Sequence, residues 1–200
     1  MFCDADDQFI STIALRVIMN EFKTGCDAII CDFMEEHNKE CIYIPHHDDA
    51  IFVHGKIYRL AFLKENKIEW NPTLREHQDS AFNIVARTLA KKTRICTMPL
   101  YMWCDNPNSI SRKEPHDVHR LKTWCAMLDS YNSIVNDFKT RGIGTRAIYY
   151  AKWALYATYW EMAHEIWHKE GYNDEKIATY KKIIEFYNTH ELAIKNCTVQ

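Results

Sequence analysis

The sequence predicts a mixed α/β domain over residues 1–114, followed by an all-helical part over residues 115–200. In the first part, short apolar segments of strand type alternate with segments of helical spacing. In the second part the apolar residues follow helical periodicity alone. Apolar residues make up 47% of the chain, and glycine and proline number five each. This composition supports a buried core and argues against a disordered chain.

The first elements are expected on either side of an acidic loop. Residues 1–3 are apolar and are interpreted as the end of a buried strand that leads into this loop. Apolar residues at helical spacing from Ile10 to Ile18 predict a helix, with Gly25 as its C-cap. Residues 27–33 contain an Ala-Ile-Ile-Cys run and predict a short buried strand.

Five further elements are expected between residues 35 and 72. The polar residues 35–40 predict a loop, and residues 41–44 predict another short strand. The sequence His46-His47-Asp48-Asp49 predicts a polar loop. Residues 56–66 are interpreted as a helix, and Asn71-Pro72 as a turn.

The α/β part ends with a helix, a strand and a loop, and three long helices follow. Residues 80–89 predict the helix, 95–103 the strand and 105–108 the loop. Glycines at 142, 144 and 171 separate the long helices, and short connections favour antiparallel neighbours. The expected long helices are residues 118–138, 148–166 and 177–187.

Charge and cysteine content exclude several classes of protein. The net charge of −2 predicts no nucleic-acid surface. The longest apolar stretch, 147–160, contains Lys152 and is shorter than the roughly 20 residues of a membrane span. Eight cysteines show no C-x-x-C spacing, and Met1 runs at once into acidic residues rather than a secretory signal. We therefore expect a cytoplasmic protein (host cytoplasm if viral) whose thiols are mostly buried and reduced.

The acidic motif Asp4-Ala5-Asp6-Asp7 is the first candidate for chemistry. Carboxylates gathered at the end of a strand repel one another unless a cation joins them. Oxygen ligands of this kind suit Mg²⁺ or Mn²⁺, which commonly take one or two carboxylates plus substrate phosphates. Taken alone, the motif is better explained as an acidic helix N-terminus, with Asp7 complementing the helix dipole.

Three later segments give the acidic motif a context. Each is weak alone, but their order downstream of Asp4 is specific. Together they resemble family-2 glycosyltransferases of the GT-A fold, with a D-x-D-D motif, a "gK-y-R" helix, an E-D-x-x-F motif and a "P-x-Y-x-y" strand leading to "x-S-I-S/T". The segments here contain Gly55-Lys56-Ile57-Tyr58-Arg59, Gln78-Asp79-Ser80-Ala81-Phe82, and Pro99-Leu100-Tyr101 with Ser109-Ile110-Ser111.

The resemblance runs from Asp4 to Arg112 and is closest to short members of the kind that phages encode. It implies a partial GT-A (Rossmann-like) catalytic half over residues 1–114, which binds metal and acceptor. The helical part from residue 115 carries no diagnostic motif. The implied reaction is metal-dependent and inverting, and it moves a sugar from a nucleotide sugar to a hydroxyl of a carbohydrate, protein or other acceptor.

The resemblance also implies roles for individual residues. Asp6 would bind the divalent metal, Mn²⁺ or Mg²⁺, that holds the diphosphate of the donor, and Asp4 would face the ribose or support the site. Asp79 would be the general base that takes the proton of the acceptor hydroxyl. Lys56 and Arg59 would lie beside the site, near the acceptor or the phosphates.

Two positions depart from the family pattern. Gln78 stands where the family usually has Glu, which removes a charge beside Asp79 and leaves the pKa of that acid less raised by a like charge. Glu76 is a candidate for the missing acid, from a different place. His54 replaces the more usual aromatic residue before Gly-Lys. Asp79 is kept as the base, and Gln78 as a donor- or acceptor-binding residue.

The resemblance lacks the family's nucleotide-binding first half. Two βαβ units of about 30 residues each would be its minimum, and only three residues precede Asp4. Three explanations stay open: Met1 is internal to a longer reading frame, a partner chain supplies the half, or the chain is a degenerate remnant. A non-enzymatic binding or structural module is therefore the alternative to a glycosyltransferase. A metal-dependent hydrolase using the same carboxylates is a weaker one.

Two other features invite functional interpretations. His46-His47-Asp48-Asp49 could suggest a metal site, but a solvated loop is preferred because adjacent side chains diverge. The aromatic side chains of the second long helix could stack on sugars or form an interface, but packing against neighbouring helices is preferred for the stripe as a whole. These aromatic residues are Tyr149, Tyr150, Trp153, Tyr156, Tyr159, Trp160 and Trp167.

Overall fold

The chain forms two compact units in the computed structural model, which describes residues 1–37, 42–49, 52–106, 109, 116–168 and 174–195. The first unit comprises residues 1–70 and 82–113. The second comprises residues 71–81 and 114–200, so a short stretch from the middle of the α/β part belongs with the helical one.

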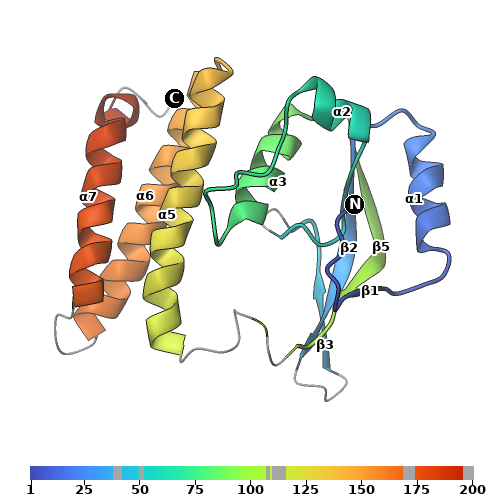
Figure 1. Cartoon of the computed structure of the whole chain (residues 1–200), viewed down its shortest axis with the longest axis horizontal. Helices are drawn as coiled ribbons and strands as arrows, with labels where there is room; N and C mark the ends of the chain where they lie inside the picture. The colour runs from blue at the N-terminus through green and yellow to red at the C-terminus, as the bar shows by residue number, and fades with distance from the viewer. Residues whose placement is uncertain (38–41, 50–51, 107–108, 110–115, 169–173, 196–200) are drawn as a thin grey trace. The chain divides into compact units, whose positions relative to one another are not determined.

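A five-stranded sheet forms the centre of the first unit (Figure 1). The parallel pair β2 (Ala28–His37) and β5 (Thr93–Trp103) lies in the middle. The short β1 (Gln8–Phe9) pairs antiparallel with the end of β5. Both β3 (Ile42–His46) and β4 (Lys56–Tyr58) pair antiparallel with β2, at opposite ends of that strand.

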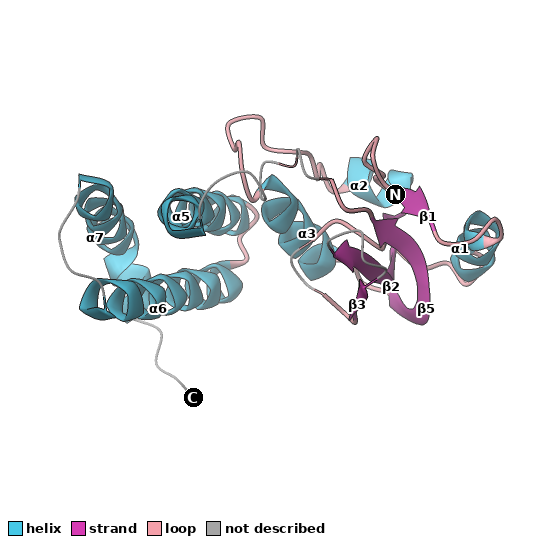
Figure 2. Ribbon diagram, turned by 90° about the horizontal axis from the view of Figure 1, so that it is seen from below, coloured by secondary structure: helices cyan, strands magenta, loops and turns pink. Residues whose placement is uncertain are grey.

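Helices lie on both faces of this sheet (Figures 1 and 2). On one face, α1 (Ala14–Phe22) buries Ala14 and Ile18 in a cluster with Ile29 and Leu100 of the strands. Gly25, with φ +71°, follows this helix two residues beyond its C-cap Lys23. The chain can therefore turn back into β2 without strain, because glycine adopts positive φ freely.

The other face of the sheet is covered by α3 (Gln78–Leu89). Phe82 of this helix meets Tyr58 of β4 edge-on, and the Tyr58 hydroxyl donates a 3.0 Å hydrogen bond to Oδ1 of Asn83. A short helix, α2 (Leu60–Glu65), connects β4 to this layer. The first six residues of β2, Ala28 to Phe33, are thus buried on both sides of the sheet, which accounts for their apolar run.

Three long helices make up most of the second unit: α5 (His116–Thr140), α6 (Gly144–His168) and α7 (Asp174–Lys195). All three pack against one another. Their shared core is formed by Leu128, Ile134, Val135, Phe138, Ala151, Ala154 and Phe186. In the described part of the chain, no helix combines the length and apolar character needed to cross a membrane.

The predicted architecture of a mixed α/β part followed by an all-helical part is confirmed. Two elements were predicted wrongly. The helix expected over residues 56–66 is strand β4 up to Tyr58, because these residues pair with β2, and only Leu60–Glu65 are helical. The loop expected over residues 35–40 is strand as far as His37, because β3 pairs with it; residues 38–41 lie outside the described part.

The start of the chain also differs from expectation. Residues 1–3 are not in a strand. Phe2 instead meets the rings of Trp70 and Phe82 edge-on, at centroid distances of 5.0 and 5.4 Å. Aromatic packing therefore fixes the entry to the acidic loop.

The prediction that the aromatic stripe of α6 packs against neighbouring helices holds only in part for its described members. Trp153 meets Tyr131 of α5 edge-on at a centroid distance of 5.1 Å, but Tyr149 and Tyr156 are largely exposed. Tyr149 is 63% exposed, Trp153 41% and Tyr156 64%. Tyr150 is half-buried against Phe138. The side chains of Tyr159, Trp160 and Trp167 lie outside the described residues. The second unit thus presents aromatic surface on α6.

The buried His190 ties α7 to α5. Its Nδ1 lies 2.9 Å from Nζ of Lys139, and its Nε2 lies 2.9 Å from Oδ1 of Asn132. A neutral ring with its proton on Nε2 satisfies both contacts, because it accepts from the ammonium and donates to the amide oxygen. Burial, together with the charge of Lys139, lowers the pKa of His190 to about 4.

We expect acid to weaken the helical unit through His190. The unfolded side chain titrates near its ordinary pKa of 6.5, whereas the folded one resists protonation down to about pH 4. The contribution of His190 is therefore fully present above pH 6.5 and is lost as the pH falls toward 4. Urea unfolding at several pH values should show a flatter pH dependence for His190→Gln. The exposed His37→Gln should keep the wild-type dependence, and equal curves for the two variants would contradict this role.

Two glycines form a matched pair for testing backbone strain. Gly55 and Gly25 both have positive φ, +69° and +71°. A Cβ on Gly55 would lie 2.4 Å from the carbonyl oxygen of Cys31, whereas one on Gly25 would meet nothing within 4 Å. We expect Gly25→Ala to cost about 1–2 kcal/mol of unfolding free energy from the left-handed backbone alone. Gly55→Ala should cost clearly more in the same urea titration; equal losses would contradict the close approach.

Candidate active site

The acidic loop before β1 is held with one carboxylate inward and two outward. The side chain of Asp7 is 1% exposed, whereas Asp4 and Asp6 are exposed. A turn fixes this arrangement, with the Asp7 N–H donating to the Asp4 carbonyl at 3.2 Å. Asn106 Nδ2 donates to Asp6 at 2.6 Å, and this bond lowers the pKa of Asp6. Asp6 is therefore an ionised, solvent-facing carboxylate beside the end of β5.

Asp7 is the anchor of this loop. The Tyr101 hydroxyl donates a short hydrogen bond to Oδ2 of Asp7, and the Cys104 N–H donates to Oδ1 at 2.9 Å. The Tyr101 oxygen also accepts the N–H of Asp4 at 3.3 Å. His54 Nδ1 lies 3.7 Å from Asp7, and the His54 ring stacks on Trp103 at a centroid distance of 5.1 Å. Both oxygens of the buried carboxylate are thus satisfied by the strand that the loop runs beside.

Residues 47–49 form a polar loop, as predicted, and the side chains of residues 46–49 are also paired with residues elsewhere in the first unit. His46 belongs to β3 and stacks on Phe33 at 4.3 Å. Although His47 and Asp48 are largely exposed, all four side chains have partners of opposite charge type. The pairs are His46 with Glu35 at 2.9 Å, His47 with Asp32 at 2.6 Å, Asp48 with Arg87 at 2.8 Å, and Asp49 with Lys56 at 3.3 Å.

Lys56 is a buried residue of β4 and has its own partners. Its side chain is 0% exposed, and Nζ donates to Asp49 and, at 3.2 Å, to the carbonyl of His54. Nζ also lies 5.4 Å from the ring centre of Phe33. Burial lowers the pKa of Lys56, against the opposing charge of Asp49. Lys56 therefore stabilises the segment before β4 through Asp49 and the His54 carbonyl, and it does not face solvent beside Asp6.

Arg59 lies at the other end of the sheet. Its Nη2 donates to Asp27 at 2.7 Å, and this bond lowers the pKa of Asp27. Asp27 directly precedes β2. The acidic loop lies beside Met102 of β5, and Met102 pairs with Met34 of β2, which is seven residues after Asp27. Seven residues of strand span roughly 20 Å. The structure therefore does not bring Arg59 together with Asp6.

Asp79 lies in the first turn of α3, in the segment 71–81 of the second unit. It is half-buried, Gln78 beside it is exposed, and Oδ1 of Asp79 accepts the Ser80 N–H at 2.8 Å. His77, before the helix, has φ +54°, and its carbonyl accepts a 2.8 Å hydrogen bond from the buried hydroxyl of Ser130 on α5. Helix α5 thus holds the backbone turn that begins α3 and carries Asp79.

A divalent cation is compatible with this loop but not caged by it. Among the described residues, no group of three or more His, Cys, Asp or Glu side chains could hold a metal ion. Mg²⁺ is commonly held by one or two carboxylates with substrate phosphates completing the shell. The exposed Asp4 and Asp6 fit that mode of binding, whereas Asp7 is fully engaged by Tyr101 and Cys104.

Sequence reasoning missed the residues that build this loop. It gave no role to Tyr101 or Asn106, and it treated Asp7 as a member of the acidic motif or as a helix-dipole complement, not as the buried anchor of the loop. The third acid of the motif and the tyrosine of Pro99-Leu100-Tyr101 were visible, but they lie 94 residues apart. Only the pairing of β1 with β5 brings them together.

Comparison with known proteins gives one curated relative. No protein-family model matches the chain. A protein of Bacillus subtilis (strain 168) named "Uncharacterized glycosyltransferase EpsJ" is 23% identical over 156 residues, which cover 66% of this chain and 45% of the relative. The matched region therefore spans less than half the length of that relative.

Solved structures give weaker likenesses. A crystal structure of S. aureus TarS 1-349 in complex with UDP-GlcNAc has a TM-score of 0.47 and 14% identity, covering 94% of this chain and 67% of that chain. A crystal structure of S. aureus TarS has a TM-score of 0.45 and 17% identity, covering 68% and 24%. Likeness of this degree assigns no function.

We expect the Tyr101 hydroxyl to be a main stabilising contact of the acidic loop. Tyr101→Phe removes a hydrogen bond to the buried, charged Asp7, and such bonds are worth about 1.5–3 kcal/mol. Urea unfolding should show a loss of this size. Tyr43→Phe, at a 45% exposed position of β3, is the matched control and should change stability little. Equal effects for the two variants would show that the contact is weak.

Proposed function

We propose that this chain is the metal- and acceptor-binding half of an inverting, metal-dependent glycosyltransferase of the GT-A type. Its reaction would move a sugar from a nucleotide sugar to an acceptor hydroxyl. The main support is the ordered series of motifs from Asp4 to Arg112, over which the chain resembles family-2 glycosyltransferases. The name of the B. subtilis relative agrees with this proposal.

The acidic loop supports the donor side of the proposal. Asp7 is turned inward by Tyr101 and Cys104, and this leaves Asp4 and Asp6 exposed together. We propose that Asp6 binds Mn²⁺ or Mg²⁺, with Asp4 facing the ribose or supporting the site. The cation would supply positive charge to a diphosphate leaving group. The low pKa of Asp6 keeps its carboxylate ionised for this role.

The acceptor side rests on Asp79. As general base, Asp79 would take the proton of the acceptor hydroxyl while that oxygen bonds to the anomeric carbon and the bond from this carbon to the diphosphate oxygen breaks. Gln78 is exposed beside Asp79 and could bind donor or acceptor without adding charge. Glu76 lies three residues earlier, before α3 begins, and is the other acid of this segment.

Lys56 and Arg59 take a different place in the proposal from the one that the resemblance implied. Lys56 is buried against Asp49, and Arg59 pairs with Asp27 at the far end of β2. We propose that both residues stabilise the fold around the site and do not contact the donor or the acceptor. Lys56 would hold the segment that carries His54, which in turn lies beside Asp7.

The nucleotide-binding half is proposed to come from another part of a longer protein or from a partner chain. Two observations support it. The match covers 45% of the curated relative. Among the described residues, no strand pairs with the outer edge of β5 over residues 93–99, since β1 reaches only Tyr101 and Met102. An open strand edge can accept a further strand by main-chain hydrogen bonding.

A non-enzymatic assembly module is the second candidate. The exposed Tyr149, Trp153 and Tyr156 on α6 favour it, because aromatic side chains are enriched at protein interfaces. Calorimetric titration of the chain with a panel of nucleotide sugars and Mn²⁺ separates the two candidates. Heat of binding that depends on Asp6 supports the glycosyltransferase. Its absence from both the chain and the chain joined to a nucleotide-binding half supports the module.

Asp79→Asn tests the catalytic assignment. In the chain joined to a nucleotide-binding half, we expect turnover of the nucleotide sugar to fall by about 10²–10⁴-fold, because a general base is lost. Donor affinity, measured by calorimetry, should be retained. Asp174→Asn, at an exposed position on α7, is the matched control and should keep full turnover. Unchanged turnover in Asp79→Asn would remove Asp79 from this role.

A further inference from the structure

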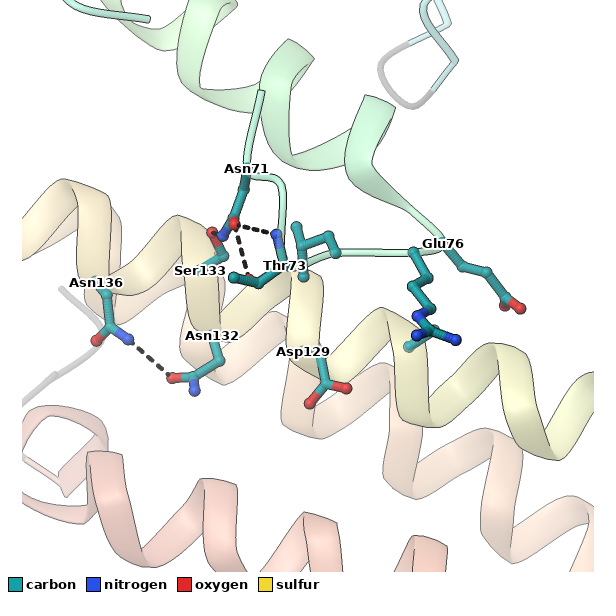
Figure 3. Close-up of a pocket in the computed structure, with 10 residues that line it drawn as sticks. Asn71, Thr73, Glu76, Asp129, Asn132, Ser133 and Asn136 are labelled. Carbon is teal, nitrogen blue, oxygen red and sulfur yellow. Dashed lines mark hydrogen bonds between the residues drawn. The ribbon is translucent and has the colours of Figure 1, made fainter. Parts of the chain in front are cut away.

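The second unit contains a polar pocket of about 490 Å³ between the segment 71–76 and the middle of α5 (Figure 3). The volume falls within the range of about 300–1,000 Å³ found for small-molecule sites. At about 30 Å³ per water molecule, it corresponds to roughly sixteen waters. The pocket is therefore large enough for a monosaccharide or disaccharide.

The loop side of this pocket is fixed by hydrogen bonds. Asn71 Nδ2 donates to the hydroxyl of Ser133 on α5 at 2.9 Å. Asn71 Oδ1 accepts both the N–H of Thr73, at 3.0 Å, and its hydroxyl, at 2.7 Å (Figure 3). Further along, the Ser130 hydroxyl holds the carbonyl of His77. The wall is thus preformed, which lowers the entropic cost of binding a ligand.

The helix side of the pocket is also ordered. Oδ1 of Asn132 is engaged by His190 Nε2 at 2.9 Å and by Asn136 Nδ2 at 3.4 Å. With its oxygen engaged in this way, Asn132 has its amide N–H groups left to offer a ligand. The buried His190 behind it keeps this orientation, because the neutral ring is held between Lys139 and Asn132.

The chemistry of the lining favours a neutral ligand rich in hydroxyl groups. Amides and hydroxyls provide donors and acceptors side by side, as each sugar hydroxyl requires. The charged members are Arg75, Glu76 and Asp129, and Asp129 is paired at 2.9 Å with Lys182. One arginine against two carboxylates does not suit a phosphate, which is typically bound by several cationic or N–H donors. Leu74 and Ala126 are the apolar members, and none of the described lining residues is aromatic.

We propose that this pocket binds the carbohydrate acceptor of the transferase, an inference that rests on the proposed function. Glu76, in the wall of the pocket, precedes Asp79 by three residues in the segment 71–81. Because α5 holds both this wall and the start of α3, the pocket and the base are positioned by one helix. The pocket thereby selects uncharged saccharides over phosphorylated ones, and saccharide binding needs neither metal nor nucleotide.

The test measures saccharide binding separately from sugar transfer. Methyl glucoside, methyl galactoside and N-acetylglucosamine are titrated into the full chain by ligand-observed NMR, with no nucleotide sugar or metal present. We expect at least one of them to bind, and Asn136→Leu and Arg75→Met each to weaken that binding tenfold or more. Asn188→Leu, at an exposed position of α7 outside the pocket, is the matched control. Thermal unfolding checks that every variant is folded.

The outcomes separate the two proposals. Binding that is lost in the pocket variants and kept in Asn188→Leu supports the pocket, even if no nucleotide sugar is turned over in a separate assay. In that case only the transferase assignment fails. The inference is overturned if none of the saccharides binds, if the pocket variants bind as the wild type does, or if glucose 6-phosphate, titrated in the same way, binds more tightly than methyl glucoside.

Discussion

The acidic loop depends on the burial of one carboxylate. Asp7 is turned inward and receives hydrogen bonds from Tyr101 and Cys104, so both of its oxygens are satisfied within the protein. A buried carboxylate without such donors would be strongly unfavourable. The same contacts hold the loop against the end of β5, and they leave Asp4 and Asp6 in solvent. One short motif thus supplies a buried acid that stabilises the loop, Asp7, and two exposed acids that can bind a ligand, Asp4 and Asp6.

Helix α5 gives the second candidate region a comparable support. Ser130 and Ser133 lie three residues apart, on one side of α5, and reach the carbonyl of His77 and the amide of Asn71. The positive φ of His77 is unusual for a residue with a side chain, and such conformations persist only where neighbouring contacts hold them. The stretch 71–81 therefore belongs structurally with the helical unit although its sequence lies inside the α/β part.

Local sequence pattern was sufficient for the longer elements. The apolar runs of β2 and β5 and the periodicity of α3, α5 and α6 predicted these elements to within about four residues, whereas α7 was predicted as a helix but ends eight residues later than expected. The pattern failed at Lys56-Ile57-Tyr58, where helical spacing and strand alternation cannot be told apart over so few residues. There the pairing with β2 decides the conformation.

The candidate site was predictable only in part, for a related physical reason. The acidic motif and Asp79 could be singled out because their residue types and order are distinctive. The partners of Asp7 and Arg59 could not, since strand pairing brings them together over 94 and 32 residues of sequence. Lys56 pairs with Asp49 only seven residues away, but its burial depends on the packing of β4 and was not visible in the sequence. The pairings of His46 with Glu35 and of His47 with Asp32 were also not predicted, because these acids lie on the neighbouring strand β2.

The unpaired edge of β5 over residues 93–99 has a consequence for handling the isolated chain. Unpaired main-chain groups on a strand invite pairing with a second molecule, and Ile95 and Met98 are 53% and 46% exposed beside them. Arg94 adds a charge to this edge, and Pro99 interrupts its row of N–H donors. Charged residues and proline at a strand edge disfavour pairing with a second molecule. Solubility of the chain should therefore improve when another strand occupies the edge.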